Sequence, residues 1–395
     1  MDVKSLGVVL SLVFREQSME HATFIQCLFN VILYLIILGI VIPFFRHKSL
    51  VPNLVVKKKY TVLIILALIL CVYPFWAGDY LNMMTDYKLA RQGEQSNWEQ
   101  VYMILSRILP SYSLLRLVIW GGSLYLLHRF FNLLTIEDKF VGVYTVLFFF
   151  AMCLPNYSYL RAASCMSLIF LGVGIFFKNE NKLKWDKFVA LLFILASFFF
   201  HKSALIAIFV AIISYFSVHL KHIKFFLILL LFLIPYAVQY GNELINNFLL
   251  ISPVEDSSIN IYAAQNYFNE QMEFGKTGSG IMVQNVLTRT QYYLVAFVYL
   301  LMLIKGYYKN MPNYVKFFAN FSFFIIVIAN ITLFAFDFNS TVLYYRIMYY
   351  SMIPSAAFLA YCFSRNYFKG ICTLTFYIAI IGTLYTFIYS TYNVL

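Results

Sequence analysis

The stretch 156–210 reads NYSYLRAASCMSLIFLGVGIFFKN, then ENKLKWDK, then FVALLFILASFFFHKSALIAIFV. It holds long apolar runs separated by one short basic turn and, further on, by the step His201–Lys202. A helix needs about 20 mostly apolar residues to cross the hydrocarbon core of a bilayer. The stretch therefore predicts membrane-spanning helices joined by a cytoplasmic basic turn, with His201 at the outer junction of two short helices.

The rest of the chain has the same character. Of its 395 residues 62% are hydrophobic and only 12% are charged, too few charges to cover a soluble globule of this size. We predict an all-α, polytopic integral membrane protein, a single membrane domain with about twelve transmembrane helices. The expected spans are 22–45, 60–77, 111–127, 140–155, 160–177, 187–200, 203–218, 225–240, 290–304, 317–336, 347–363 and 371–390. The apolar stretch 6–14 is too short to span and is interpreted as an interfacial helix.

The connecting loops then alternate between two sides of the membrane, and basic residues gather on one of them. Six loops on that side hold 18 of the 29 Lys and Arg residues but only four acidic ones. The positive-inside rule assigns this side to the cytoplasm, which places both termini outside. The net charge of +12 is thus explained by topology, and no nucleic-acid partner is needed. These loops are 46–59, 128–139, 178–187, 219–224, 305–316 and 365–369.

The two sides also differ in the type of basic residue. The inner loops carry 15 Lys and three Arg, whereas the outer side carries seven Arg and four Lys. Arginine is preferred where a planar, permanently charged group must bind phosphate or carboxylate with two hydrogen bonds. Arg116, Arg161, Arg289 and Arg346 lie at or within outer helix ends, where charges are costly and usually functional. The alternative is that they reach the interface or pair with outer acidic residues, as Arg346 would with Asp337.

Two long segments, 78–110 and 241–289, form most of the outer face. The first is expected to be amphipathic and partly interfacial. The second contains GKTGSG at 275–280, which lacks the spacing of a phosphate-binding loop and is interpreted as a hinge. A loop of this length is usually functional, so we expect it to cover a cleft. The six cysteines fall in or beside apolar spans, without metal-ligand spacing, and are expected to be buried.

The motif in the opening stretch resembles the EpsG family and related Wzy-type polysaccharide polymerases. In that family an arginine opens one helix, here Arg161, and a small-residue helix later ends in a Phe-His-Lys/Ser-like step, here at His201. GDYLNMMTDY at 78–87 resembles the family's GxDYxxY region, and Trp98–Tyr102 its aromatic-acidic continuation. The chain lacks the arginine often found before that region, and Tyr87 is displaced from the usual interval.

The resemblance implies polymerisation of polyprenyl-diphosphate-linked repeat units of an O-antigen, capsule or exopolysaccharide. The growing glycan would be transferred onto the incoming unit at the outer leaflet of a bacterial cytoplasmic membrane, with inversion and with no metal or cofactor. A flippase and a chain-length regulator are the expected partners, besides membrane lipid.

The same resemblance suggests roles for individual residues. His201 or Asp79 would take the proton from the acceptor hydroxyl, and Arg161 would act with them. The arginines named above, with Lys202, would stabilise charge on the departing diphosphate. Tyr157 and Tyr345 would line the sugar site, although tyrosine is also common at membrane interfaces.

Two other functions remain open at this stage. Twelve helices suit a flippase or another transporter of lipid-linked oligosaccharide, but such proteins place charges near the bilayer midplane, and here charges gather at one face. A membrane O-acyltransferase would use one membrane-embedded histidine, with its acyl donor coming from the cytoplasmic side.

Overall fold

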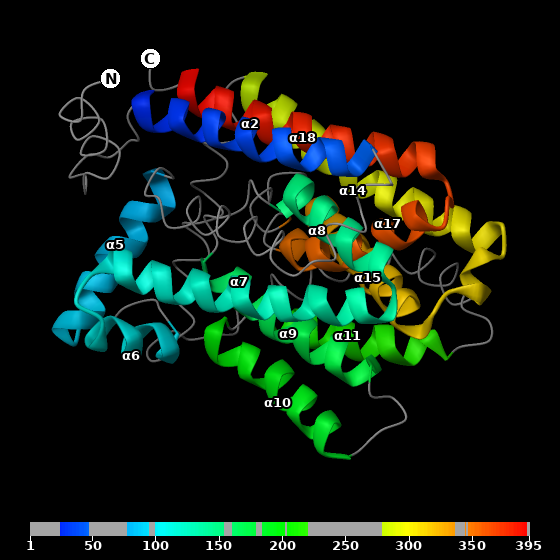
Figure 1. Ribbon diagram of the computed structural model, residues 1–395. Coiled ribbons are helices and arrows are strands. Elements are labelled where there is room, and N and C mark those ends of the chain that lie inside the picture. The colour runs from blue at the N-terminus through cyan, green and yellow to red at the C-terminus, as the bar shows by residue number, and fades with distance from the viewer. Residues whose placement is uncertain are drawn as a thin grey trace. The chain divides into compact units, whose positions relative to one another are not determined.

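The computed structural model describes residues 24–46, 77–94, 99–153, 160–178, 184–201, 204–219, 279–335, 344 and 347–392. These residues form helices joined by short turns, and no strand occurs among them. The chain divides into two compact units, and Figure 1 labels their helices. The first comprises residues 1–208 and 356–395, and the second comprises 209–355. The expected all-α class is confirmed for the described part of the chain.

Most of the described helices belong to the first unit. They are α2 (Phe24–Arg46), α5 (Ala77–Gln92), α6 (Gln100–Ile108), α7 (Tyr112–Glu137), α8 (Lys139–Cys153), α9 (Leu160–Lys178), α10 (Lys184–Phe200) and α18 (Lys369–Tyr392). Two further helices, α11 (Ala204–Val218) and α17 (Met352–Ser364), cross the boundary between the units.

Helices α7, α9 and α10 form the closely packed centre of this unit. Ser123 on α7 lies 3.0 Å from Ser164 on α9, and further along both helices Gly174 packs against Phe130, so α7 and α9 run in the same direction. A Cβ atom on Gly172 of α9 would lie 2.6 Å from the carbonyl oxygen of Ala190 on α10. Only glycine allows this approach, which brings the start of α9 to the end of α10.

Aromatic packing joins α2 to α8, α17 and α18 at one end of the same unit. The ring of Phe45 stacks on Phe376 with centroids 3.8 Å apart and on Phe363 with centroids 4.5 Å apart. It also meets Phe148 edge to face. Arg46, the last residue of α2, donates a hydrogen bond from Nε to the hydroxyl of Tyr377 on α18. The end of α2 and the start of α18 therefore lie together, as the alternation of loops requires.

The second unit contains α14 (Ser279–Ile304), the short helix η3 (Tyr307–Asn310), α15 (Asn313–Ala335) and η4 (Tyr349–Ser351). Its interior holds a hydrogen-bonded polar network around the fully buried Asn320. The side-chain carbonyl of Asn320 accepts from the hydroxyls of Tyr299 and Tyr308, and its amide donates to Ser217. A buried amide satisfied in this way fixes the packing of its neighbours.

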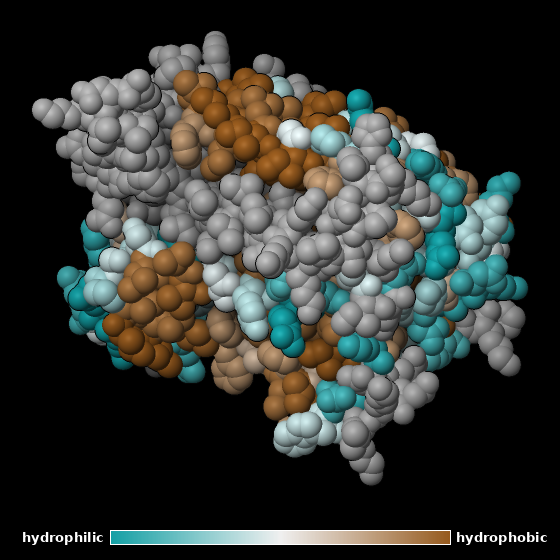
Figure 2. Space-filling model, in the orientation of Figure 1, coloured by the Kyte–Doolittle hydropathy of each residue, from teal (hydrophilic) through white to brown (hydrophobic). Residues whose placement is uncertain are grey.

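The helices have the composition of membrane spans. Tyr112–Thr135, Arg161–Lys178 and Asn313–Thr332 are long and apolar enough to cross a bilayer, and five shorter apolar helices accompany them in the described part. α2 also presents large exposed hydrophobic side chains, which form an apolar surface in Figure 2. In water such a surface would be unfavourable, whereas lipid chains cover it at no cost. The exposed residues on α2 are Leu28, Ile32, Leu35, Ile36 and Ile40.

Most expected spans coincide with observed helices, within a few residues. The expectations for 6–14, 225–240 and, apart from Ala77, 60–77 lie outside the described residues. The helices on either side of His201 are separate, since α10 ends at Phe200 and α11 begins at Ala204. Two helix ends differ clearly. Helix α14 begins at Ser279 instead of 290, because 279–289 contains no helix breaker after Gly280. Helix α7 continues to Glu137 instead of ending at 127, so most of the expected loop 128–139 is helical.

Candidate functional site

Three charged or titratable side chains from separate segments meet in the first unit. The Oε2 atom of Glu99 lies 3.1 Å from Nη1 of Arg161, and its Oε1 atom lies 2.9 Å from Nδ1 of His201. Glu99 is only 7% exposed, whereas Arg161 is 26% and His201 20% exposed. The buried carboxylate of Glu99 thus contacts two side chains, Arg161 and His201, that are partly exposed.

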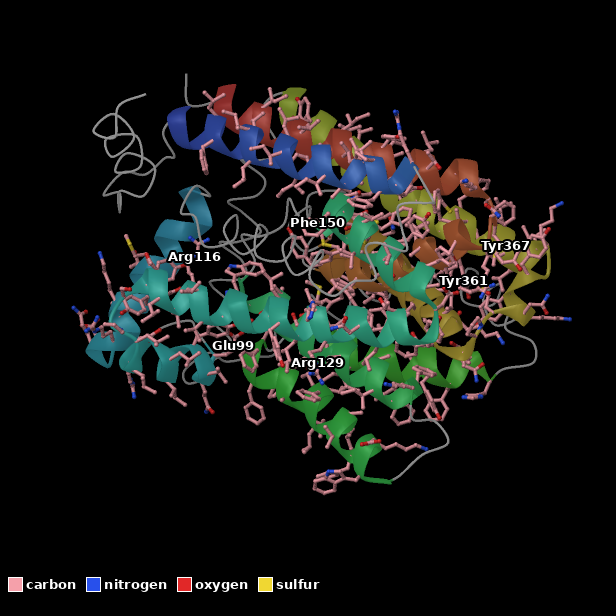
Figure 3. All side chains as sticks on the ribbon, viewed as in Figure 1. Glu99, Arg116, Arg129, Phe150, Tyr361 and Tyr367 are labelled. Carbon is pink, nitrogen blue, oxygen red and sulfur yellow. The ribbon has the colours of Figure 1, made fainter. Side chains whose placement is uncertain are left out.

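Each side chain is placed by the end of a helix. Glu99 directly precedes α6, Arg161 lies in the first turn of α9, and His201 directly follows α10. The backbone N–H of His201 donates to the carbonyl of Ser197, so His201 continues the last turn of α10. Because α9 and α10 are antiparallel neighbours in close contact at Gly172, the start of one meets the end of the other. Figure 3 labels Glu99 beside these helices.

The electrostatics of the cluster favour an ionised Glu99. Burial alone raises the pKa of a carboxyl group, but the hydrogen bond from His201 and the positive charge of Arg161 outweigh it. Together they lower the pKa of Glu99 from its ordinary 4.5 to about 2. At neutral pH the carboxylate is therefore charged and can only accept hydrogen bonds.

Tyr102, one turn into α6, supports the same cluster. Its fully buried ring meets Phe200 edge to face, with centroids 6.0 Å apart, and Phe200 is the residue before His201. Its buried hydroxyl lies close to Ser164, one turn after Arg161 on α9. Burial raises the pKa of this phenol, so it stays neutral. Helix α6 is thereby anchored to both helices that carry the accessible partners of Glu99.

Helix α5 is tied to α6 and to the start of α7 by hydrogen bonds to backbone carbonyls. Arg91 donates to the carbonyl of Pro110, and Arg107 donates to that of Ala90. The hydroxyl of Tyr87 donates to the carbonyl of Leu109. The segment 78–110 is therefore largely two helices braced against each other, which gives Glu99 a fixed position.

Among the selected residues whose side chains are described, the structure brings together Arg161 and His201. Arg116 is in the same unit, buried on α7 (Figure 3), with its guanidinium 5.9 Å from the ring centre of Tyr112. Arg289 is in the second unit, on α14, with its guanidinium 5.2 Å from the ring centre of Tyr344. The side chains of the remaining selected residues lie outside the described part: Asp79, Tyr157, Lys202, Asp337, Tyr345 and Arg346.

Glu99 was missed as a site residue by the sequence analysis. It falls within the aromatic-acidic stretch 98–102, but an acidic residue just before a helix is most simply interpreted as its N-terminal cap. The structure excludes that explanation, since the Glu99 side chain makes no capping hydrogen bond. Only the antiparallel packing of α9 and α10 brings Arg161 and His201 to the same buried carboxylate.

The remaining side chains of chemical interest are potential metal ligands and cysteine thiols. In the described part, no group of three or more His, Cys, Asp or Glu residues is placed to hold a metal ion. Cys165, Cys362 and Cys372 are buried thiols, as expected from their apolar surroundings.

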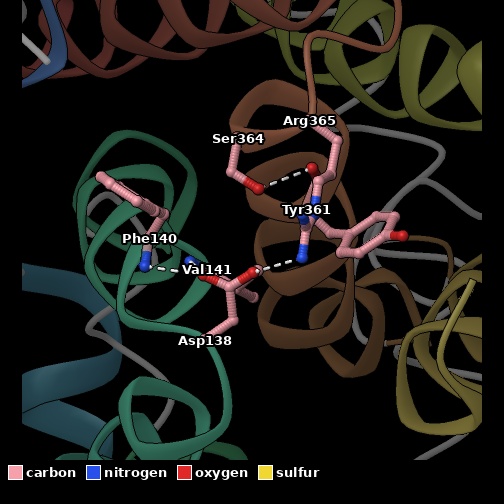
Figure 4. Close-up of polar contacts among 6 residues, drawn as sticks. All are labelled: Asp138, Phe140, Val141, Tyr361, Ser364 and Arg365. Carbon is pink, nitrogen blue, oxygen red and sulfur yellow. Dashed lines mark hydrogen bonds and ion pairs between the residues drawn. The ribbon is translucent and has the colours of Figure 1, made fainter.

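A second carboxylate–arginine pair lies at the far end of the same helices. Asp138, between α7 and α8, accepts hydrogen bonds from the backbone N–H groups of Phe140 and Val141 and so caps α8. Its other oxygen lies 3.1 Å from Nη2 of Arg365, in the turn between α17 and α18 (Figure 4). This pair joins two loops that were expected on the same side of the membrane.

The apolar helices and the charged cluster at their ends define the class of the molecule as an all-helical integral membrane protein. Its family follows from comparison with known proteins. The model of the EpsG family matches residues 58–395, which include Glu99, Arg161 and His201, and the chain belongs to this family. No curated protein and no solved structure matches the chain. The family suggests a role in membrane polysaccharide polymerisation.

Proposed function

We propose that the protein is a membrane glycosyltransferase that polymerises polyprenyl-diphosphate-linked oligosaccharide repeat units. It acts at the outer leaflet of a bacterial cytoplasmic membrane, with the end of the first unit that carries Glu99 facing outward. The growing glycan moves from its lipid diphosphate onto the incoming repeat unit. Free polyprenyl diphosphate is released.

One observation carries this proposal beyond family membership. Arg161 and His201 come from outer segments about 40 residues apart, and both bind the same buried carboxylate. A positive group and a proton acceptor in one accessible cluster are the two elements that glycosyl transfer from a diphosphate requires.

The reaction can be assigned to these residues. The acceptor hydroxyl oxygen forms a bond to the anomeric carbon of the donor glycan, and the bond from that carbon to the diphosphate oxygen breaks. The proton of the hydroxyl goes to the imidazole of His201, and the bonding electrons leave with the diphosphate. Direct displacement inverts the anomeric centre and requires no metal.

Arginine stabilises the charge that develops on the leaving diphosphate. A guanidinium has five N–H donors, so Arg161 can hold Glu99 and still bind a second anion. Arg289 lies over the ring of Tyr344, with its guanidinium carbon 5.2 Å from the ring centre. Arg289, Arg346, Lys202 and Arg116 remain the further diphosphate-binding candidates that the sequence motif suggests.

The test is deletion of the gene in its native host, followed by analysis of lipid-linked glycans on each membrane leaflet. Single repeat units that accumulate on the outer leaflet support the proposal. Units trapped on the inner leaflet would indicate a flippase instead. Full-length polymer that lacks only acyl groups would indicate an O-acyltransferase.

A matched pair of variants tests the residue assignment in the same host. Arg161→Ala should abolish long polymer, whereas Arg365→Ala, which removes an arginine of the same kind from the opposite end, should leave polymer length unchanged. Normal polymer from an Arg161→Ala protein present at the wild-type level would contradict the assignment.

A further inference from the structure

Glu99 occupies a position where a carboxylate normally caps a helix, yet it caps nothing. Its backbone accepts hydrogen bonds from the N–H groups of Tyr102 and Met103, but its side chain turns away from them. The carboxylate instead lies buried between Arg161 and His201. Burial of a charge is costly unless it is paired, so this arrangement calls for a role other than helix capping.

The contact to His201 fixes which imidazole nitrogen carries a hydrogen. An ionised carboxylate has no proton to donate, so in the 2.9 Å contact the Nδ1 atom must be the donor. In a neutral imidazole with a hydrogen on Nδ1, the other nitrogen, Nε2, is an acceptor. The partner of one ring nitrogen thus determines the chemistry of the other.

We propose that Glu99 is a positioning residue, which holds His201 in the Nδ1–H tautomer and thereby makes Nε2 the atom that takes the proton from the acceptor hydroxyl. This inference rests on the proposed function, because it assigns the geometry of its proton-transfer step. It adds a residue and an atom to that function, neither of which the sequence motif specified.

Charge balance supports the same role. Before reaction the negative Glu99 and the positive Arg161 compensate each other, and a neutral His201 adds no charge. When His201 takes the proton, its new positive charge faces the carboxylate at hydrogen-bond distance. The imidazolium is stabilised only as it forms, so this interaction favours the transition state over the ground state.

The packing of helix α6 restrains the position of Glu99, as a positioning residue requires. Tyr102 on α6 packs edge to face against Phe200, the last residue of α10, and its hydroxyl lies close to Ser164 on α9. Movement of α6 away from α10 would therefore disturb a fully buried tyrosine. Catalytic groups held in this way keep the orientation that proton transfer needs.

The test uses full-length protein in lipid nanodiscs, with the lipid-linked repeat unit extracted from the deletion strain as substrate. We expect Glu99→Gln to lower kcat roughly 100-fold with KM changed less than threefold, since a partner of this kind typically contributes that much. Glu99→Asp, which keeps the charge, should recover at least a tenth of the lost rate. Asp138→Asn, which alters a carboxylate paired at the same distance, should leave kcat unchanged.

A second readout is independent of turnover. Nitrogen-15 spectra of histidine-labelled protein, with the His201 signal identified by its absence in His201→Gln, should show the Nδ1–H tautomer in wild type and in Glu99→Asp. In Glu99→Ala the preference for this tautomer should be lost. An Nε2–H tautomer in wild type would overturn the proposal whatever the folding of the variants.

The outcomes separate this inference from the function on which it rests. If His201→Gln abolishes polymerisation while Glu99→Gln retains kcat within threefold, the role of Glu99 is wrong and the proposed function stands. If wild-type protein forms no polymer from the extracted repeat unit and the deletion strain shows no outer-leaflet accumulation, the proposed function itself is wrong.

Discussion

Two carboxylate–arginine pairs of equal length lie at opposite ends of the first unit, and they are built differently. Glu99 and Arg161 are 3.1 Å apart, as are Asp138 and Arg365. The position of Ser123 beside Ser164 sets their separation along the α7 and α9 axes, at about 27 Å for a rise of 1.5 Å per residue. That length is close to the hydrocarbon thickness of a bilayer, which is about 30 Å.

The pair at Asp138 has an ordinary structural explanation. Its carboxylate caps α8 with one oxygen and binds Arg365 with the other, and Arg365 is 56% exposed. The pair at Glu99 differs in three ways. The Glu99 side chain caps no helix, it is nearly buried, and it binds a histidine as well as an arginine. The Asp138 side chain caps a helix, whereas the Glu99 side chain does not. The ion pair of Glu99 is therefore the better indication of function.

The largest expected difference between the two ends of the first unit is in the rate of polymer formation. His201→Gln should lower the rate of polymer formation about 1000-fold, since a positioned general base typically contributes 100- to 10,000-fold. The measurement is the initial rate of release of polyprenyl diphosphate by purified protein. Arg365→Gln is the control at the other end and should retain the wild-type rate. A His201→Gln protein within fivefold of wild type would show that another group takes the proton.

The next effect is on stability. Arg161→Met leaves the buried Glu99 without its cation and should lower the free energy of unfolding in detergent by about 3 kcal/mol. Arg365→Met leaves Asp138 with its capping hydrogen bonds and should cost less than about 1 kcal/mol, as for exposed pairs. Equal losses for the two variants would remove the contrast between the two ends.

A smaller effect is expected from the close contact that brings the two helices together. Gly172→Ala places a methyl group against the carbonyl of Ala190, so α9 and α10 must separate slightly. We expect a loss of about 1–2 kcal/mol in unfolding free energy, typical of overpacking, together with slower polymerisation. Gly122→Ala on α7 is a matched control, since a Cβ there meets no atom within 4 Å. Reduced activity in both variants would point to a general sensitivity of the bundle.

The smallest effect is one of pH. Because the pKa of Glu99 is lower in the folded protein than its ordinary 4.5, its ionised form stabilises the fold above about pH 4.5. That contribution is lost as the pH falls toward about 2. The difference in Tm between wild type and Glu99→Gln should therefore shrink as the pH falls from about 4.5 toward about 2. A difference that does not shrink in this range would contradict the assigned ionisation.

The sequence predicted the helices well, because their signal is local. Apolar runs identify spans directly, and the Asp138–Arg365 pair joins two loops that were expected on one side of the membrane. Arg161 and His201 were also selected from a local signal, since each belongs to a motif at the end of an apolar run. Helix boundaries were less well predicted at α14, where the helix begins before the continuous apolar run does.

Glu99 was beyond the reach of such reasoning because its role depends on tertiary contact. Nothing next to it in sequence distinguishes it from a capping residue, and Asp138 shows what a capping carboxylate looks like in this fold. The distinction requires knowing how α6 packs against the other helices, as the contact of Tyr102 on α6 with Phe200 on α10 shows.

The most direct test of the account is a double-mutant cycle between Glu99 and His201, measured as kcat for polymer formation. If Glu99 acts through His201, Glu99→Gln should slow wild-type protein roughly 100-fold but should have little further effect in a His201→Gln background. Independent contributions would instead multiply, so that the double variant would be about 100-fold slower than His201→Gln alone. That second result would contradict the proposal that the two residues work as one unit.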